Sequence, residues 1–461
     1  MQVWFNDLNN LDDLFDQIKP TTYEEINDKD IEDFKESIQY FIGDYIDTHI
    51  ESYKEKGFET VMFEDLYKLI KQAYVDIDID DYFKSDTHYE STVWDAIQIY
   101  LHKHNAFRSY CNTNIVNKPD VKMLKQKLKS YENMEQPEQL SKEWFEFRRE
   151  GLSASDLYKA LDSQSKQNNL ALSKCEPIDF NKKFSSNINS PCHNGHRYEP
   201  LSIMHYEKDF NTEVGEFGCI KHSIHKFLRA SPDGINTDPT NDRYGRLVEV
   251  KNPTSRVLDG VPEKAYWVQM QMQMEVWDLD ECDFLETTFK EYESEEAFYK
   301  DGETFIQREN GMRKGITVQF FNGNKPHYEY PPVDISEEEF DKWYAIILEK
   351  NKELAYIKNI YWYLMDYSCV LVPRNRKWFD HILPKLQQFW KTILEERETG
   401  YEHRRPKNPR KRPKKIPILT NILGDPITEQ NIGQNIGQNI GQNIGQNIGQ
   451  NIVINISTET L

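Results

Sequence analysis

The chain has 461 residues, too many for one compact core, so its length predicts two or three domains plus tails. No apolar run reaches the ~18 residues of a membrane span, and the acidic start Met1–Asp12 does not resemble a signal peptide, so we expect a soluble intracellular protein without membrane contact. The formal net charge of −20 argues against nucleic acid as a partner, although a local site can reverse it, as carboxylates do once they bind Mg²⁺.

Residues 1–135 predict a helical accessory domain. Apolar residues recur there at helical spacing between acids and lysines: Ile31, Phe34, Ile38, Phe41, Ile42, Tyr45 and Ile46. This stretch assembles no reactive constellation. A structural role is therefore the favoured interpretation, with partner docking as the alternative.

Residues 141–300 alternate between helices and short strands. We expect Ser141 to cap a helix that runs through Trp144 and Arg148, and Ser153 with Asp156 to open the next helix in the manner of a capping box. A helix from about Gly195 to Asp209 tolerates Pro200 only near its first turn. Strand-like runs near 213–220 and 226–231 then lead to the turn Pro232-Asp233-Gly234.

A further strand, Gly245–Asn252, precedes the ambiguous segment Pro262–Asp278. Its apolar residues alternate as in a strand, yet Met, Gln, Glu and Ala favour a helix, and the run is long for a strand. We predict a helix with one face formed by Tyr266, Gln269 and Gln273 and another formed by Met270, Met274 and Trp277. A strand at 282–289 follows.

Residues 301–400 predict a mixed α/β extension that completes or flanks this core. Strands are expected near 316–321, 327–331 and 361–372, with a helix capped by Ser336 and Glu339 and a last helix near 376–398. Residues 401–461 predict a disordered tail. Arg404–Lys415 holds eight basic residues and three prolines, and residues 431–450 are five Asn-Ile-Gly-Gln units. The basic run fits DNA binding, nuclear localisation or a solvated linker.

Five residues between 199 and 269 form the constellation that carries chemistry. Glu249 and Lys251 belong to one strand as Glu-Val-Lys and project from the same face, with Val250 on the other. Asp233 ends the preceding hairpin and can reach Glu249, Glu199 lies on a helix, and Gln269 follows on the next helix. Carboxylates and the Val250 carbonyl are ligands for a hard cation such as Mg²⁺, which activates water, and Lys251 can stabilise charge on a phosphate.

The order of these residues carries a resemblance to known nucleases. An acid, a Pro-Asp and an acid-x-Lys sixteen residues later form the signature of the PD-(D/E)xK nucleases. Trp144–Phe289 also resembles the YqaJ-like viral recombinase family, relatives of the phage lambda exonuclease. The resembling runs are WFEFRREGLSAS (144–155), GHRYEP (195–200), ASPDG (230–234), LVEVKNPTSR (247–256) and YWVQMQ (266–271). Together they cover about a third of the chain.

The resemblance implies an α/β (α+β) restriction-endonuclease-like core, with a central mixed sheet flanked by helices. It implies an exonuclease that degrades duplex DNA ends with Mg²⁺ or Mn²⁺, two ions being expected, and leaves single-stranded tails for viral recombination or repair. Glu199, Asp233 and Glu249 match metal ligands, Lys251 matches a catalytic lysine, and Gln269 matches a glutamine that orders the site.

Phosphate contacts are implied as well. Arg148 and Ser155 match residues that hold the phosphate at the DNA end, and the first turn of a helix would favour an anion there. Ser255 and Arg256 are weaker candidates for backbone contact. A single-strand annealing protein as partner and a homo-oligomer are left open, because the chain carries long regions that the simple family members lack. If viral, the protein would act in the host cytoplasm or nucleus.

Three alternatives stay open at this point. An endonuclease would use the same chemistry on the same fold. A non-catalytic DNA-binding scaffold is disfavoured because all three acids and the lysine are present. Structural zinc at Cys192, His193 and His196, or at Cys219, His222 and His225, is disfavoured because the spacing is not that of a common finger and the six cysteines form no CxxC pair.

Overall fold

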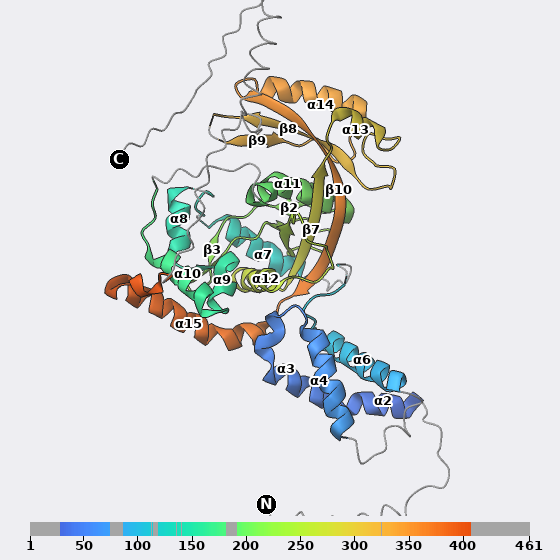
Figure 1. Cartoon of the computed structure of the whole chain (residues 1–461), viewed down its shortest axis with the longest axis vertical. Coiled ribbons are helices and arrows are strands. Elements are labelled where there is room, and N and C mark those ends of the chain that lie inside the picture. Colours follow the sequence, from blue (N-terminus) through green and yellow to red (C-terminus); the bar gives the residue numbers. More distant parts are fainter. Residues whose placement is uncertain are drawn as a thin grey trace, which may run out of the picture.

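The computed structural model describes residues 28–73, 86–111, 113, 119–134, 136–139, 141–180, 191–323 and 325–406. Within them a helical bundle, a central α/β core and an outer extension lie side by side (Figure 1). The predicted repeat segment 431–450 and all of the basic run beyond Pro406 lie outside the described residues. None of the described helices has the length and apolar character that crossing a membrane requires.

The N-terminal part is helical, as predicted. Its apolar stripe is divided at Ile38 between two helices, and Ile38, Ile42 and Ile46 are buried. The elements of this bundle are α2 (Asp28–Ser37), α3 (Gln39–Thr48), η1 (Ile50–Lys54), α4 (Phe58–Ala73) and α6 (Asp86–Lys103). The next helix, α7 (Val121–Glu132), contacts the core instead, where the Tyr131 hydroxyl donates to the Trp277 carbonyl at 2.5 Å.

A seven-stranded mixed sheet forms the core, in the order β2-β5-β6-β7-β10-β8-β9. Its strands are β2 (Val214–Gly215), β5 (Gly234–Asn236), β6 (Leu247–Lys251), β7 (Glu281–Glu291), β10 (Ala355–Pro373), β8 (Lys314–Phe321) and β9 (Pro326–Glu329). Strands β6 and β7 run parallel, and the other neighbouring pairs are antiparallel. A small second sheet pairs β1 (Leu152–Ser153) in parallel with β4 (Leu228–Ala230), which also pairs with β3 (Ile220–Lys221).

Helices cover both faces of the large sheet, which confirms the predicted mixed α/β core (Figure 1). Val248 and Val250 of β6 pack against Tyr206 of α11 (Pro191–Phe210). Glu249, between them in the sequence, contacts α12 (Lys264–Trp277) instead. Alternation along β6 therefore separates an apolar face from the face that carries Glu249. The remaining helices of the core are α8 (Lys142–Arg149), α9 (Ala154–Ala160) and α10 (Gln164–Cys175).

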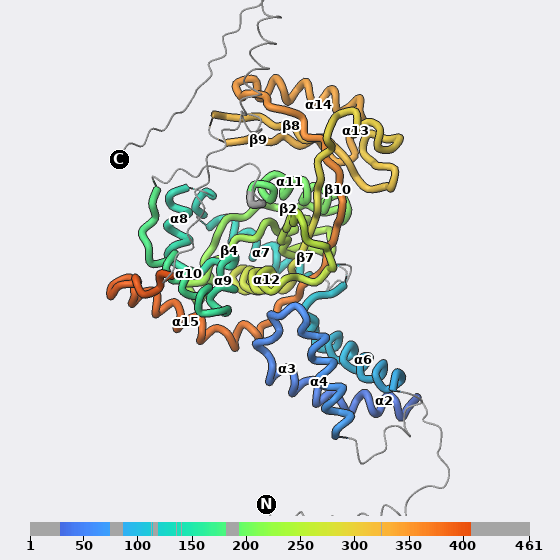
Figure 2. The backbone as a smooth tube through the Cα atoms, in the orientation of Figure 1, coloured from blue at the N-terminus to red at the C-terminus, as the bar shows by residue number. Residues whose placement is uncertain are grey.

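Residues 301–400 complete the core sheet. The long strand β10 pairs with β7 along one edge and with β8 along the other, so it joins the core to the outer extension (Figure 2). The extension also holds α13 (Glu295–Lys300) and α14 (Glu337–Lys350), the latter with the predicted Ser336–Glu339 capping box. The last helices are α15 (Arg376–Thr399) and η2 (Glu402–Arg404).

Three local expectations were wrong. The run 213–220 divides between two sheets: β2 of the large sheet ends at Gly215 and β3 of the small sheet begins at Ile220, and between them the Gly218 amide donates to the Gln136 side chain. Helix α11 begins at Pro191, so Pro200 lies in its interior, where packing offsets the missing hydrogen bond: Tyr198 and Leu201 beside it are each 2% exposed. Ser153 precedes α9 but makes no side-chain cap.

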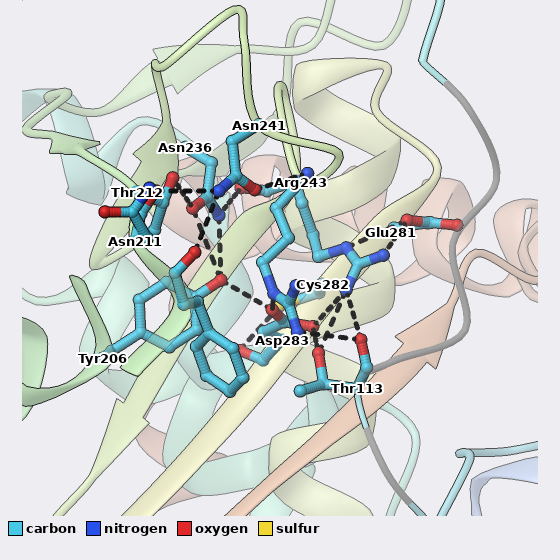
Figure 3. A network of polar contacts seen from close by, with 12 residues as sticks. Thr113, Tyr206, Asn211, Thr212, Asn236, Asn241, Arg243, Glu281, Cys282 and Asp283 are labelled. Carbon is cyan, nitrogen blue, oxygen red and sulfur yellow. Dashed lines mark hydrogen bonds and ion pairs between the residues drawn. The ribbon is translucent and has the colours of Figure 1, made fainter. Parts of the chain in front are cut away.

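A buried ionic network fastens the core together (Figure 3). The Asp283 carboxylate of β7 is fully buried and accepts from Arg246 Nη1 at 3.0 Å and from the Tyr206 hydroxyl at 2.6 Å. Arg243 Nε lies 3.4 Å from it, and the Thr113 hydroxyl donates to it as well. One carboxylate thus contacts two buried guanidinium groups, of which Arg246 also pairs with Glu281, and ties Thr113 to the sheet.

Asp283→Asn is expected to lower the free energy of unfolding by about 3 kcal/mol, because it removes the buried carboxylate that faces Arg243 and leaves Arg246 with Glu281 alone. Chemical denaturation checks this. The matched control is Asp280→Asn, whose exposed carboxylate pairs with Arg374 and Arg376 and should contribute less than about 1 kcal/mol. Equal losses in the two variants would contradict a special role for the buried pair.

Candidate active site

The candidate site lies at the carboxyl end of β6, where Glu249 and Lys251 project from one face as predicted. Glu249 is fully buried and Lys251 is half-buried. The Lys251 ammonium forms an ion pair with Glu249 Oε1 and donates to the Val250 carbonyl at 3.1 Å. Lysine therefore contacts two of the oxygens that the sequence predicted as metal ligands.

Two glutamines of α12 hold the Glu249 carboxylate. Gln269 Nε2 donates to Oε1 and Gln273 Nε2 donates to Oε2, each at 2.6 Å. Gln273 also donates to the Ser231 carbonyl at 3.0 Å, next to the turn that carries Asp233. Gln269 was predicted as a site residue; Gln273 was placed on the same helix face but not assigned. Its i, i+4 spacing from Gln269 was the signal.

Asp233 reaches the same strand end from the turn between β4 and β5. Its Oδ2 accepts the Val250 amide at 2.7 Å, so the side chain is fixed across β5 to β6. The following glycine is required by packing: a Cβ at Gly234 would lie 2.2 Å from Val214 Cγ1 of the neighbouring strand. In the Pro-Asp-Gly sequence, the glycine thus lets β5 lie close to β2, and the aspartate places a carboxylate beside Val250.

Glu199 of α11 belongs to the same electrostatic group. Burial raises the pKa of its carboxyl; Lys251 partly offsets this, and the Glu249 and Glu216 charges raise it further. The pKa of Asp233 is raised well above its ordinary value, first by burial and then by Glu249, with an opposing effect of Lys251 and a smaller contribution from Glu199. Glu199 and Asp233 therefore both lie close enough to the Glu249 charge for it to disfavour their ionised forms.

Lys251 responds in the opposite sense. Burial alone would lower its pKa, but the nearby Glu249 and Asp233 carboxylates outweigh that effect and raise it above the ordinary lysine value. Its ammonium also lies 5.3 Å from the centre of the Tyr266 ring. Lys251 is therefore held as a cation, suited to hydrogen-bond donation and charge stabilisation rather than to proton abstraction.

The donor set has the chemistry of a hard-cation site. Three carboxylates and one backbone carbonyl are oxygen ligands, the type that Mg²⁺ and Mn²⁺ prefer. The raised pKa values of Glu199 and Asp233 mean that a bound cation would relieve repulsion which Lys251 now relieves only in part. In the described part of the chain, however, no three His, Cys, Asp or Glu side chains stand at metal-binding spacing. These acids are neighbours rather than a preformed cage.

The zinc alternatives gain no support from the geometry. His222 Nδ1 accepts the backbone amides of Ile224 at 3.0 Å and His225 at 2.9 Å, which uses its lone pair. His193 Nε2 lies 2.6 Å from the Tyr328 hydroxyl. The side chain of Cys192 lies outside the described residues.

Arg148 and Ser155, predicted to hold a phosphate, are brought together. Arg148 Nη2 donates to Ser155 Oγ at 2.9 Å, and the guanidinium lies 4.6 Å from the centre of the Trp144 ring. Ser141 caps α8, the helix of Trp144 and Arg148, as predicted: its side chain accepts the Trp144 amide at 3.0 Å. Helix α9, which carries Ser155, has only seven residues, so little of any attraction for an anion comes from its dipole.

Two cations behind this pair were missed from the sequence. Lys174 is 5% exposed and donates to the Arg148 carbonyl at 2.7 Å and to Ser153 Oγ at 3.4 Å. Burial lowers the pKa of Lys174 to about 8; Asp156 raises it, and Arg148 and Arg229 lower it. Arg229 of β4 is 4% exposed and lies over the Phe147 ring at 4.4 Å. The acidic chain thus has a locally basic cluster, which the unremarkable spacing of these residues did not reveal.

Ser255 and Arg256 lie in the loop between β6 and α12. Ser255 is exposed. Arg256 forms an ion pair with Glu286, a fully buried acid of β7 that is in register with Lys251. The Arg256 guanidinium lies 5.6 Å from the centre of the Tyr266 ring, beside Lys251. Glu286 was not predicted, because an acid within an apolar strand gives no signal of its partner.

Comparison with known proteins agrees with the predicted resemblance. Residues 143–288 match the model of the YqaJ-like viral recombinase domain, which confirms it for that part of the chain. An uncharacterised protein, R354, of Acanthamoeba polyphaga mimivirus is 34% identical over 294 residues. The match covers 56% of this chain and 52% of the relative, so the chain spans about half the length of that protein.

Solved structures overlap with the chain at low similarity. The alkaline exonuclease LHK-Exo from Laribacter hongkongensis is 18% identical, with a TM-score of 0.32 over 57% of this chain and 95% of that one. Its complex with dAMP gives 0.34, again at 18% identity, over 56% and 95%. A phage-related exonuclease from Haemophilus somnus 129PT is 12% identical, with a TM-score of 0.28 over 53% and 96%.

Asp233→Asn tests the carboxylate repulsion, since an asparagine oxygen still accepts the Val250 amide. A raised folded-state pKa means that ionised Asp233 destabilises the fold above its ordinary pKa, and that the effect vanishes in acid, where folded and unfolded forms are both protonated. We expect the variant to melt about 3 °C higher than the wild type in EDTA at pH 8. The difference should disappear below about pH 4. A variant that melts no higher at pH 8 would contradict the repulsion.

Proposed function

We propose that this protein is a metal-dependent DNA exonuclease that acts on duplex ends and produces single-stranded tails for viral recombination or repair. The observation that carries the proposal is the end of β6, where Glu249, Lys251 and Asp233 converge on one backbone segment. The matched YqaJ-like domain, residues 143–288, includes all three and agrees with it.

The chemistry proposed for this site is phosphodiester hydrolysis. A divalent cation, Mg²⁺ or Mn²⁺, would supply activated water and neutralise charge on the phosphate. Glu249 and Asp233, with Glu199 and the Val250 carbonyl, are the residues that would hold it. Lys251, kept cationic by its neighbours, donates hydrogen bonds to the phosphate oxygens as negative charge develops. Gln269 and Gln273 orient the Glu249 carboxylate and so limit the motion of the ligand set.

Action at DNA ends is favoured by the basic cluster around Arg148. A guanidinium beside a hydroxyl can bind a phosphate by several charge-assisted hydrogen bonds. The neighbouring buried Lys174 and Arg229 add positive charge beneath it. Strands β1 and β4 run parallel, and their carboxyl ends lead to Ser155 and to Asp233, so the cluster and the end of β6 belong to neighbouring parts of the core. Such a cluster would hold a terminal phosphate while the adjoining bond is cut.

The decisive assay compares a 5′-labelled linear duplex with a closed circular duplex, each with Mg²⁺, Mn²⁺ or EDTA. We expect the wild type to degrade linear DNA only with metal and to leave circles intact. Glu249→Gln and Lys251→Met should each slow the reaction by about 10²-fold or more, because each removes a group required in the transition state.

Matched controls are Glu338→Gln and Lys342→Met, which alter an exposed Glu–Lys pair on α14 and should cleave like the wild type. Cutting of circles would replace the exonuclease assignment by an endonuclease with the same site. If no DNA is cut with any metal while duplex ends are bound equally with and without it, the protein is a DNA-binding scaffold instead.

A further inference from the structure

The N-terminal bundle is seated on the helix that supports the active site. Trp267 of α12 donates its indole N–H to the Arg108 carbonyl at 2.9 Å, and the Arg108 guanidinium lies 5.6 Å from the centre of the Trp267 ring. Arg108 is 1% exposed and also donates to the Tyr53 carbonyl at 3.1 Å. The contact is therefore buried and specific, although this bundle lies outside the matched family domain, which begins at residue 143.

One lysine extends the bundle to the loop that follows the catalytic strand. We define the active-site loop as residues 252–263, between Lys251 of β6 and the start of α12. Lys56, in the turn before α4, places its ammonium 2.7 Å from Asp259 Oδ2 and 2.8 Å from Glu263 Oε1. Two carboxylates at the far end of this loop therefore share one cation from the bundle.

The near end of the active-site loop is fixed by the core. Asn252 Nδ2 donates to Ser202 Oγ at 2.9 Å and to Thr287 Oγ1 at 2.7 Å. Between the two anchors Thr254, Ser255 and Val257 are exposed, the last to 80%. The path of the middle of the loop thus depends on both ends, and the bundle holds one of them.

Arg256 lies in that middle part and connects the loop to the catalytic lysine. Its Nη1 is 3.9 Å from Glu263 Oε1, the same oxygen that Lys56 contacts, and its other nitrogen pairs with Glu286. Arg256 and Lys251 both lie over the Tyr266 ring. A continuous set of contacts therefore leads from the bundle through Glu263 and Arg256 to the catalytic strand.

We propose that the N-terminal bundle is part of the nuclease machinery, with Lys56 as a positioning residue that holds the active-site loop so that its exposed part, at Ser255, meets a phosphate of the DNA beside Lys251. The inference rests on the proposed nuclease function. The terminal nitrogens of Arg256 are buried against Glu286, so Arg256 fixes the loop from beneath and acts as a second positioning residue. Lys56 itself contacts acidic residues of the loop and acts through Arg256.

A purely structural tether would behave differently from a positioning residue. Lys56, Asp259 and Glu263 side chains are 34%, 47% and 42% exposed, so solvent screens their attraction and they contribute little to folding stability. The buried Arg108–Trp267 contact keeps the bundle attached without them. Loss of Lys56 should therefore leave the melting temperature nearly unchanged and act on the loop.

The test uses the full chain and compares Lys56→Met with Lys385→Met. Lys385 pairs with Glu51 and joins the same bundle to α15, away from the loop. We expect Lys56→Met to raise the KM for linear duplex by about three- to fivefold, the size set by a screened ion-pair network, with kcat nearly unchanged. Lys56→Arg should restore the KM.

Arg256→Gln shows whether Lys56 acts through Arg256. If it does, the double variant Lys56→Met/Arg256→Gln has the KM of Arg256→Gln alone, because coupled residues are not additive. Multiplied effects in the double variant, or a Lys56→Met variant indistinguishable from Lys385→Met, would overturn the inference while the nuclease function stands. A wild type that cleaves no DNA would overturn the proposed function and this inference with it.

Discussion

The carboxyl groups of Glu199 and Asp233 lie in a buried region close enough to the Glu249 charge that their pKa values are raised, and the rest of the site depends on this repulsion. The protein holds the arrangement with hydrogen bonds that fix individual oxygens: the Val250 amide for Asp233, and Gln269 and Gln273 for Glu249. Lys251 supplies the positive charge that makes the cluster tolerable, and the cluster in turn keeps Lys251 protonated. A divalent cation bound at this site would relieve the repulsion between the carboxylates. Under the proposed function, the bound cation would also reverse the local negative charge, so that a site in an acidic chain accepts a phosphate substrate.

The surrounding architecture keeps these groups from moving apart. Strand β6 lies inside the sheet, between β5 and β7. Its neighbour β7 is held by the buried Asp283, which contacts Arg243 and Arg246. Strand β10, from the C-terminal region, covers the other edge of β7, and the N-terminal bundle is fastened to α12 through Trp267. Regions on either side of the matched domain therefore support the same strand end. The basic cluster of Arg148, Lys174 and Arg229 is formed by α8, α10 and β4 of the smaller sheet, so it and the cluster at the end of β6 occupy separate elements.

Much of this could be predicted from the sequence, because it depends on short-range rules. The period of two along Glu249-Val250-Lys251 set which residues share a face, and the composition of 264–277 favoured a helix over a strand. The family resemblance placed Arg148 with Ser155. What could not be predicted depends on contacts between distant segments. Glu286 becomes a site residue only through its register with Lys251, and Lys174 and Arg229 come near Arg148 only through the parallel pairing of β1 with β4. The packing that tolerates Pro200 within α11 and the role of Lys56 are of the same kind.

The measurement that tests the central claim most directly is a calorimetric titration of the metal-free protein with Mn²⁺, in two buffers of different ionisation enthalpy. If the crowded carboxylates form the cation site, Mn²⁺ binds and displaces protons from acids of raised pKa, so the observed heat depends on the buffer and affinity increases from pH 6 to pH 8. Asp233→Asn should weaken the binding strongly and reduce the proton release. Binding that is absent, or that is unchanged in Asp233→Asn, would contradict the account, because the repulsion among these acids would then serve no cation.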